Sequence, residues 1–298
     1  MAEMDDVKIA FIGAGKIAYS LVPAFIEKGF TVQSIISRDI KSAKDLADQN
    51  RIKNYYDNIG NDLIEADLIF LTVPDDSIEV VVNALLETRI RFDNKIIVHT
   101  SGAKSSKDIS MLESIGVITA SFHIMQTFPF LQRVAIEDSY TAIETQNESC
   151  FSLLQNISSR LNLKPFRIET ELKVVYHLLG TIASNFLVEK FYNIENCYKK
   201  MNDDFPTSHD LLLPLINKTL ENLMNKGSEK SLSGPIERGD LTTIKNHLAV
   251  IEGNSDFSLS YAAVSLNLVN LAETKGSIDR VKANELRKFL KQKIKELI

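Results

Sequence analysis

The segment GAGKIA at residues 13–18 has the residue types and spacing that bind the phosphates of a nucleotide. Gly13 permits a tight turn, and Gly15 lets the backbone approach a pyrophosphate because it has no Cβ. Ala18 allows a helix to pack closely on the strand before it, and the first N–H groups of that helix face the anion. A bare GxGxxA could be only a tight turn, but the apolar run before it favours a dinucleotide site. The predicted phosphate-binding residues are Gly13, Ala14, Gly15, Lys16 and Ile17.

The residues after the second apolar run, Ser37-Arg38-Asp39, bear on which dinucleotide binds. An NAD site usually has an acidic residue here for the ribose 2′-hydroxyl, whereas an arginine accommodates the 2′-phosphate of NADP. Ser37 can donate a hydrogen bond to that phosphate, and Arg38 offers a flat guanidinium that stacks on adenine. Asp39 lies two residues past the strand, where we expect it to cap the next helix. We therefore favour NADP over NAD, although Arg38 could also be a solvated loop residue.

Three further segments follow later strands of the same predicted sheet. Thr72, Val73 and Pro74 follow one strand, Ser101 and Gly102 follow the next, and His123 ends the one after. Ligands of an open parallel sheet bind beyond the carboxyl ends of its strands, so these residues should surround the nicotinamide half of the cofactor. Each segment alone could be a turn, and it is their joint position that predicts a site.

A polar stripe runs through the apolar segment 174–191 at intervals of four residues, at His177, Thr181 and Asn185. Four residues advance a helix by about 400°, so these side chains lie in one narrow sector. Such a stripe is either a packing seam or the wall of a polar cleft. We take His177 and Asn185 as candidate site residues.

The segment SLSGPIERGD at 231–240 adds a candidate arginine. Gly234-Pro235 predicts a turn, and Asp240 is expected to be the N-cap of the following helix. Arg238 lies in a short rigid loop, from which its guanidinium could donate two hydrogen bonds to an anionic group.

The elements that must position these residues differ between the two halves of the chain. Short apolar runs alternate with helical patterns in the first half, at 7–12, 31–37, 66–73, 95–100 and 116–123, with further candidates at 139–143 and 165–168. Apolar runs separated by helices are typical of a doubly wound parallel sheet. We therefore predict an α/β domain of the Rossmann type over residues 1–168.

From residue 169 onward the chain has helical periodicity, at 171–200, 209–227, 240–251, 257–275 and 278–297. This change predicts an all-helical second domain over residues 169–298. The 174–191 helix is apolar on more faces than a helical domain of about 130 residues can cover, so we predict a homodimer through this domain.

Composition excludes several classes of protein. The chain has 34 basic and 39 acidic residues, and this net charge of −5 argues against a nucleic-acid partner. No apolar run approaches the ~20 residues of a membrane span, and the acidic start MAEMDD is unlike a signal peptide. Cys150 and Cys197 lack the paired spacing of a zinc site, and we predict no metal. We expect a cytoplasmic protein with a small-molecule substrate.

These motifs together resemble a family of Rossmann-like proteins that carry a C-terminal domain of unknown function and are assigned as NADP oxidoreductases. The resemblance rests on GAGKIA, TVPDD, VHTSGA, the His123-x-x-Gln126-Thr127-Phe128 segment, YHLLGTIASNF and SGPIERGD, which run from residue 13 to residue 240. The last two motifs are the most specific. The family is similar to pyrroline-5-carboxylate reductase, ketopantoate reductase and the β-hydroxyacid dehydrogenases. The resemblance implies a 6-phosphogluconate dehydrogenase-like architecture, in which a helical domain covers the nicotinamide and usually forms the dimer.

The chain departs from these relatives at two places. Ile124-Met125 replaces the Pro-Leu that usually follows the histidine. The dehydrogenases place a catalytic lysine four residues before an asparagine, whereas here Thr181 stands four residues before Asn185. An acid with the pKa of lysine is therefore absent from that position.

The resulting hypothesis is an NADPH-dependent reductase of a small carbonyl or imine substrate that bears a carboxylate. His123 or His177 would donate the proton. Asn185 would orient the substrate, and Arg238 would anchor its carboxylate. The alternative is a non-catalytic NADP-binding sensor or assembly protein on the same fold, which Thr181 in place of lysine favours.

Overall fold

The computed structural model describes residues 7–201 and 206–298, so the acidic amino terminus noted above lies outside the described residues. Contacts within the chain divide it into an N-terminal unit, residues 1–186, and a C-terminal unit, residues 187–298. This division falls inside a long helix, α5 (Lys173–Tyr198). The domain boundary between residues 168 and 169 stays a prediction.

The described strands form one sheet of the N-terminal unit, in the order β3-β2-β1-β4-β5-β6-β7-β8. They are β1 (Lys8–Ile12), β2 (Thr31–Ile36), β3 (Asn54–Tyr56), β4 (Leu68–Leu71), β5 (Ile96–His99), β6 (Ile118–Ile124), β7 (Tyr140–Glu144) and β8 (Lys164–Arg167). The strands β1 to β6 are parallel to their neighbours, which confirms the predicted Rossmann-type topology. The sequence analysis missed β3, because three residues are too few to show a periodicity.

The sheet departs from the parallel arrangement at one edge. β7 pairs with β6 in the antiparallel direction, and β8 is parallel to β7. Residues 125–139, which join β6 to β7, contain no described helix. A parallel neighbour needs a crossover that returns the chain to the other end of the sheet, whereas an antiparallel neighbour needs only a loop. The sheet is therefore mostly parallel.

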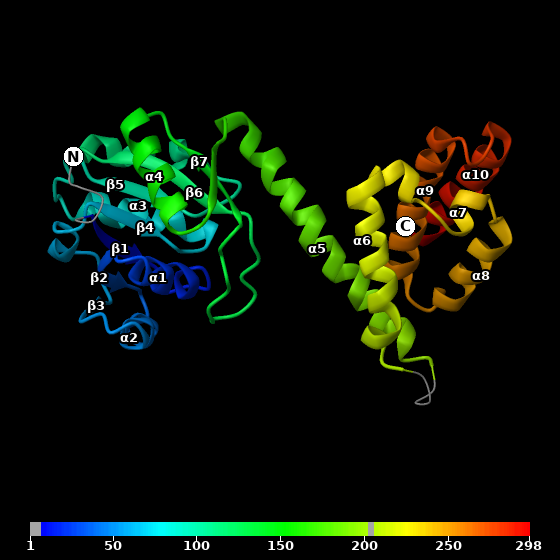
Figure 1. Cartoon of the computed structure of the whole chain (residues 1–298), viewed down its shortest axis with the longest axis horizontal. Helices are drawn as coiled ribbons and strands as arrows, with labels where there is room; N and C mark the ends of the chain where they lie inside the picture. The colour runs from blue at the N-terminus through cyan, green and yellow to red at the C-terminus, as the bar shows by residue number, and fades with distance from the viewer. Residues whose placement is uncertain (1–6, 202–205) are drawn as a thin grey trace. The chain divides into compact units, whose positions relative to one another are not determined.

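Helices cover both faces of the sheet (Figure 1). The helices α1 (Ala18–Glu27), α2 (Ile40–Gln49) and α4 (Glu148–Arg160) share one buried cluster with alternate strand residues such as Phe11 and Phe70. The helix α3 (Asp75–Glu87) and the 3-10 helix η3 (Ser106–Ile115) share a second cluster with the intervening residues, such as Ile12 and Leu71. Successive strand residues point to opposite faces, so each strand contributes to both cores.

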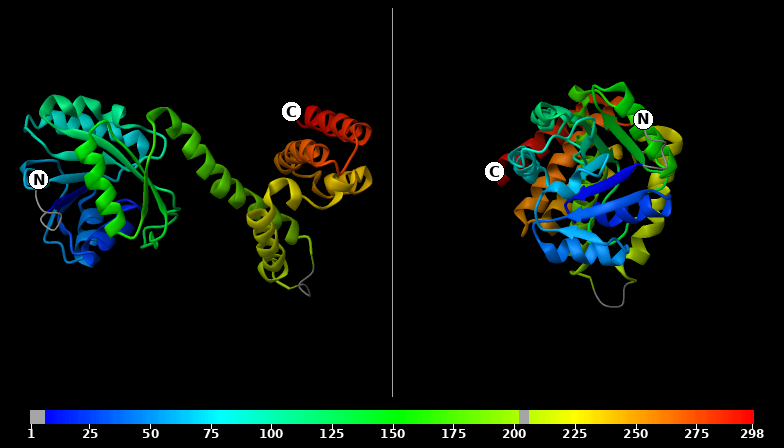
Figure 2. Two further views of the ribbon diagram at one scale, coloured as in Figure 1. Left: turned by 45° about the horizontal axis from the view of Figure 1, so that its top comes forward. Right: turned by 90° about the vertical axis from the view of Figure 1, so that its left-hand side faces the viewer.

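The register of the central strands determines where the site lies. Ile12 of β1 pairs with Leu71 of β4, which pairs with His99 of β5, which pairs with Ser121 of β6. The segments that follow β1, β4 and β5 therefore begin side by side at one edge of the sheet. Both views in Figure 2 show the strands of this unit, β1 in dark blue, beside one another.

The described part of the C-terminal unit is helical, as predicted. It contains the end of α5, then α6 (Ser208–Ser231), α7 (Pro235–Arg238), α8 (Leu241–Ile251), α9 (Ser255–Lys275) and α10 (Arg280–Leu297). Its core consists of buried residues such as Ile244, Val269 and Leu290. The short helix α7 replaces the simple turn that Gly234-Pro235 predicted, because proline is favoured in the first helical turn.

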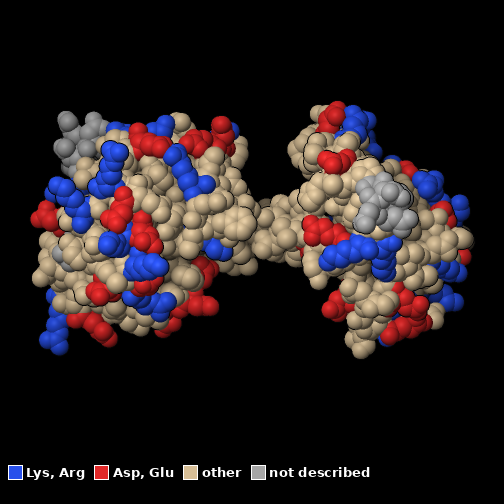
Figure 3. Space-filling view, turned by 90° about the horizontal axis from the view of Figure 1, so that it is seen from below, with Lys and Arg blue, Asp and Glu red and all other residues tan. Residues whose placement is uncertain are grey.

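None of the described helices has the length and hydropathy needed to cross a membrane. On the face of the molecule shown in Figure 3, basic and acidic side chains are intermixed.

Candidate functional site

A cleft of about 650 Å³ lies in the N-terminal unit at the carboxyl ends of β1, β2 and β4. Its lining includes most of the predicted cofactor-binding residues, which are Gly13, Ala14, Gly15, Ser37, Arg38, Thr72, Val73 and Pro74. Of the predicted set, Lys16, Ile17, Ser101 and Gly102 lie outside this lining. The structure thus brings together three segments that are far apart in the sequence.

Positions 13 and 15 have no room for a side chain, because the backbone of Thr72 lies against both glycines. Gly13 has a φ of 109°, and a Cβ there would lie 2.6 Å from the carbonyl oxygen of Thr72. A Cβ at Gly15 would lie 3.0 Å from the same oxygen. Thr72 also donates its hydroxyl hydrogen to the carbonyl of Gly13, at 2.6 Å. Strand β4 therefore holds the phosphate loop through its backbone, and side chains on the loop would push the two apart.

The loop leads directly into a helix, as an anion site requires. The first turn of the helix closes when the N–H of Ala18 donates to the carbonyl of Gly15, at 2.9 Å. The amides of Gly15, Lys16 and Ile17 precede this bond, so they are the N–H groups that a helix start offers to a phosphate.

The end of β2 has the arrangement that the sequence predicted for Asp39. This residue caps α2, with its carboxylate accepting from the backbone N–H of Lys41 at 3.1 Å and from that of Ser42 at 3.3 Å. Ser37 and Arg38 line the cleft. Asp57 and Asn58, which follow β3, line it too, and they were missed because β3 itself was missed.

His99, the last residue of β5, is a buried residue of the site that the sequence analysis did not single out. Its Nε2 donates to the carbonyl of Ser105 at 2.9 Å, and its Nδ1 accepts from the backbone N–H of Ser101 at 3.2 Å. These two contacts use both ring nitrogens of a neutral imidazole. Burial lowers the pKa of His99 to about 4, so the ring is neutral at pH 7. Its function is to hold the loop at residues 100–105.

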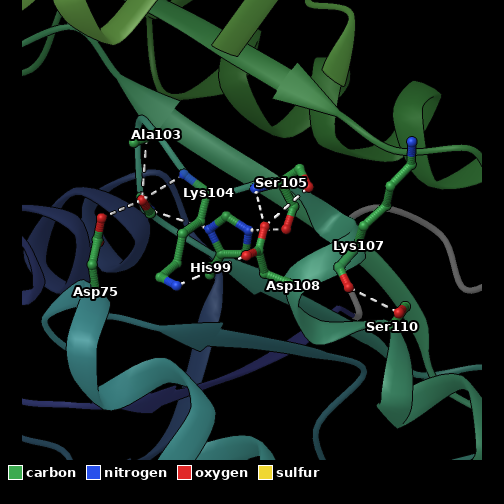
Figure 4. Close-up of polar contacts among 9 residues, drawn as sticks. Asp75, His99, Ala103, Lys104, Ser105, Lys107, Asp108 and Ser110 are labelled. Atoms are coloured by element: carbon green, nitrogen blue, oxygen red, sulfur yellow. Dashed lines mark hydrogen bonds and ion pairs between the residues drawn. The ribbon is translucent and has the colours of Figure 1, made fainter. Parts of the chain in front are cut away.

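Carboxylates hold the same loop from two sides, as Figure 4 shows. Asp108 accepts from the backbone N–H of Ser105 at 2.7 Å, which forms a capping box at the start of η3. Asp75, at the start of α3, accepts from the hydroxyl of Ser101 at 2.7 Å. The predicted site residue Ser101 is therefore a buried link between two strand ends.

Two histidines converge on Gly102. A Cβ at this position would lie 2.8 Å from Nε2 of His123 and 2.7 Å from Cδ2 of His177. His123 is half-buried in β6, and the strand ends one residue later at the buried Ile124, the residue that replaces proline. His177 lies on α5 and is exposed. Glycine at position 102 is what lets the loop approach both rings, so these three predicted residues do come together.

Tyr176 fixes the orientation of His123. Its hydroxyl lies 2.9 Å from Nδ1 of His123, and the two rings meet edge to face. Burial raises the pKa of Tyr176, so the phenol keeps its proton and donates it to Nδ1. When the phenol donates to Nδ1, the proton of a neutral His123 lies on Nε2, the nitrogen beside Gly102. Burial, followed by the charge of Lys173, lowers the pKa of His123 to about 3, so the neutral form is the one present at pH 7.

Lys173, the first residue of α5, is completely buried and was missed by the sequence analysis. Its Nζ donates to the hydroxyl oxygen of Ser121 at 2.8 Å and faces the carbonyl of Ser101 at 3.4 Å. Burial lowers the pKa of Lys173 to about 8. A signal was present in the sequence, because Lys173 stands four residues before His177 and extends the predicted polar stripe by one turn.

Glu144, the last residue of β7, is the buried carboxylate of the same cluster. It accepts from the backbone N–H of Ser106 at 2.6 Å and from the hydroxyls of Ser106 and Thr170, each at 2.9 Å. Its other contact is with the hydroxyl of Ser121 at 3.4 Å, so Ser121 lies between the ammonium and the carboxylate.

The remaining predicted residues of the stripe are less constrained. The Thr181 hydroxyl donates to the carbonyl of His177 at 3.2 Å, within its own helix. Asn185 is exposed. Asn185 stays a candidate site residue on the evidence of its position.

Arg238 belongs to the C-terminal unit and is exposed at the end of α7. The flanking Gly234 and Gly239 have φ values of 98° and 69°, which other residues rarely adopt. Glu237 forms an ion pair with Lys275 at 2.6 Å, which holds the short helix to α9. Asp240 caps α8, as predicted, by accepting from the backbone N–H of Thr243 at 3.0 Å. The loop that carries Arg238 is thus rigid.

We predict that His99→Gln costs less stability in acid than at neutral pH. The amide of glutamine can still donate to Ser105 but cannot titrate. In the wild-type protein, His99 binds a proton below about pH 6.5 when the chain is unfolded, but only near pH 4 when the chain is folded. The stability of the wild type therefore falls over this range, whereas that of His99→Gln does not change through this residue. The difference in free energy of unfolding between the two proteins should shrink by about 2 kcal/mol between pH 7 and pH 5.

Urea unfolding of both proteins at the two pH values measures this difference. His209→Gln, at an exposed histidine, is the matched control and should show no such change. A difference for His99→Gln that stays constant with pH would mean that His99 is not held neutral by burial.

Solved structures with the same fold include a protein of Bacteroides fragilis assigned as an NADP oxidoreductase. It is 25% identical, with a TM-score of 0.75, over 88% of this chain and 98% of that chain. A protein of Thermotoga maritima is 24% identical, with a TM-score of 0.63, over 90% of this chain and 99% of its own. An imine reductase of Myxococcus stipitatus, solved with NADP⁺, is 13% identical, with a TM-score of 0.61, over 97% and 94% of the two chains. No curated protein matches the sequence.

Two family models match the sequence and between them span most of it. Residues 3–124 match a Rossmann-like domain, in agreement with the parallel strands β1 to β6. Residues 139–268 match a domain of unknown function called DUF2520. The second match begins at β7, where the sheet reverses direction, and extends into α9. The chain therefore carries a Rossmann-like domain followed by a DUF2520 domain.

Proposed function

We propose that this protein is an NADP(H)-dependent oxidoreductase that reduces a small carbonyl or imine substrate. The observation that carries the proposal is the position of the His123–Tyr176 pair. It lies at the same sheet edge as the nucleotide cleft, with Nε2 of His123 facing Gly102. The likeness to the Bacteroides fragilis NADP oxidoreductase supports this function, and so does the fold shared with imine reductases.

The cleft residues fit a dinucleotide. Gly13 and Gly15 form a surface that a Cβ would fill, and the amides at the start of α1 are available to a pyrophosphate. Ser37 and Arg38 offer a hydroxyl and a charge to a 2′-phosphate. Bound NADPH supplies hydride chemistry, and the protein supplies binding, orientation and electrostatics.

His123 is placed to stabilise charge on the substrate. Reduction of an imine adds a hydride to carbon and a proton to nitrogen, and the bond between them becomes single. The neutral imidazole of His123 would donate its Nε2–H hydrogen bond to the substrate nitrogen or oxygen. The exposed His177 would supply the proton, because it contacts both the site and solvent.

The substrate class is inferred from the polar residues beyond this pair. Asn185 would orient the substrate by hydrogen bonding, since it lies two turns beyond His177 on the same face of α5. Arg238 would bind a substrate carboxylate, because its rigid loop presents an exposed guanidinium. These two assignments make the preferred substrate a small imine or keto compound that bears a carboxylate.

A non-catalytic NADP-binding sensor or assembly protein is the second candidate. Thr181 favours this candidate, because it occupies the position at which the related dehydrogenases have a catalytic lysine. Its hydroxyl donates a hydrogen bond within α5 and cannot replace the acid that lysine provides. The fold alone does not decide between the two functions.

We also propose that the protein is a cytoplasmic homodimer. Apolar side chains of α5 are exposed in the described chain, among them Val174, Leu179, Phe186 and Val188, at 53–67% of their full exposure. Figure 3 shows this part of α5 as uncharged, tan surface. A patch of this kind marks an interface, and a second copy of α5 would cover it.

We expect the purified protein to oxidise NADPH in the presence of a cyclic imine or keto acid that bears a carboxylate. A spectrophotometric panel that pairs each carboxylate with its methyl ester measures the preference. Tight NADPH binding without turnover across the panel would instead support the sensor. Arg238→Leu should raise KM for the acids and leave the esters unchanged.

We expect Arg38→Ala to weaken NADPH binding and to leave NADH binding nearly unchanged. A charge-assisted hydrogen bond contributes about 1.5–3 kcal/mol, or about 10- to 150-fold in Kd. Gly15→Val is the matched control and should weaken both cofactors, because its side chain would stand where the pyrophosphate approaches. Calorimetric titration measures all four affinities. Unchanged NADPH affinity in Arg38→Ala would contradict the assignment of Arg38 to the 2′-phosphate.

Light scattering should give a mass near twice 33.4 kDa at micromolar concentration. Replacing Leu179 with Glu on the exposed face of α5 should reduce it to that of one chain, because a buried unpaired charge disfavours association. A native mass near 33.4 kDa would contradict the dimer.

A further inference from the structure

Lys173 is a buried charge that the proposed reaction does not use. The side chain has no exposed surface, and its ammonium makes contact with only two described acceptors, Ser121 Oγ and the carbonyl of Ser101. Burying an ammonium is costly unless the surrounding groups compensate for the lost water. An apolar residue would fill the same position without that cost, so the charge itself needs an explanation.

Acidic groups surround Lys173 from three elements. Glu144 of β7, Asp108 of η3 and Asp75 of α3 all stabilise its charged form. Glu144 and Asp75 are joined to it through serines, since Ser121 contacts Glu144 and Ser101 donates to Asp75. The ammonium is thus tied to the ends of β5, β6 and β7 together, and it remains mostly protonated at pH 7.

Basic groups surround His123 instead. Lys173 and His177 face it from α5, and His99 faces it from β5. Its one described hydrogen-bond partner, Tyr176, is an uncharged phenol. A positive charge on this imidazole would be repelled by the lysine and would find no carboxylate in contact with it.

We propose that Lys173 is a positioning residue of the site, whose buried ammonium holds the Ser101–Gly102 backbone against the two histidines and adds to the burial that keeps His123 uncharged. The consequence for catalysis rests on the proposed function. With His123 uncharged, its Nε2–H is a hydrogen-bond donor that does not give up its proton, and the proton for the substrate comes from elsewhere. Lys173 therefore adds to the burial that leaves His177, and not His123, as the acid.

Nuclear magnetic resonance of the full-length protein with ¹⁵N-labelled histidine and backbone tests the proposal without a substrate. The chain has five histidines, so single variants assign their ring signals. In the wild type, the ring signals of His123 and the amide signal of Gly102 should shift with a midpoint near pH 8, as Lys173 loses its proton. His123 itself should not titrate above pH 4.

Three variants separate the charge from the packing. Lys173→Met removes the ammonium and should raise the His123 midpoint, because the repulsion is lost while the burial stays. Lys173→Arg keeps a charge that does not titrate, so the transition near pH 8 should vanish while His123 stays uncharged. Lys107→Met removes an exposed charge of η3 that pairs with Glu171 and should leave the wild-type behaviour intact.

The proposal is overturned if the wild type shows no transition near pH 8, if the transition persists in Lys173→Arg, or if folded Lys173→Met leaves the His123 midpoint unchanged. Should Lys173→Met fail to fold, the wild type and Lys173→Arg still decide.

Kinetics with an accepted substrate provide the second readout. The kcat of the wild type should show no inflection from His123 above pH 4, and in Lys173→Met an inflection from His123 should lie at higher pH than in the wild type, with KM little changed. Absence of turnover in every variant would count against the proposed oxidoreductase function. The resonance titrations would still test the proposed role of Lys173, because they need no substrate.

Discussion

The register of the parallel strands is the constraint on which the rest of the structure depends. Ile12, Leu71, His99 and Ser121 lie in one row across β1, β4, β5 and β6. A slip of one residue would exchange the side chains that a strand presents to the two cores, so packing on both sides of the sheet prevents it. The phosphate loop and the Ser101–Gly102 turn therefore start from fixed points on a single edge.

Burial of polar groups sets the chemistry at that edge. His99 has both nitrogens hydrogen bonded and is uncharged, which makes it a support for the loop and not an acid. Glu144 and Lys173 are compensated by serine and threonine hydroxyls and by backbone groups. Because each buried group has its partners, the loop that carries Gly102 has little freedom to move, and the two histidines beside it are held in place.

Helix α5 serves two environments at once. Its first turns contribute Lys173, Tyr176 and His177 to the sheet edge. Apolar residues on its other sides, such as Val175 and Leu178, stay about half exposed. A helix that is apolar on most sides is normally buried, and here the N-terminal unit covers only the side that carries the site.

The sequence by itself determined the Rossmann-type alternation, the helical second half, the phosphate loop and the capping role of Asp39, since each depends on local patterns of a few residues. Strand β3 was too short to show such a pattern, and the reversed β7 depended on how residues 125–139 return to the sheet. His123, His177 and Gly102 were identified separately, but only the tertiary structure placed them in contact. It alone revealed Lys173 and Glu144, because the burial of a charged residue depends on segments distant in the chain. The neutral state of His123 also depends on burial, so it could not be predicted from the spacing of residues in the sequence.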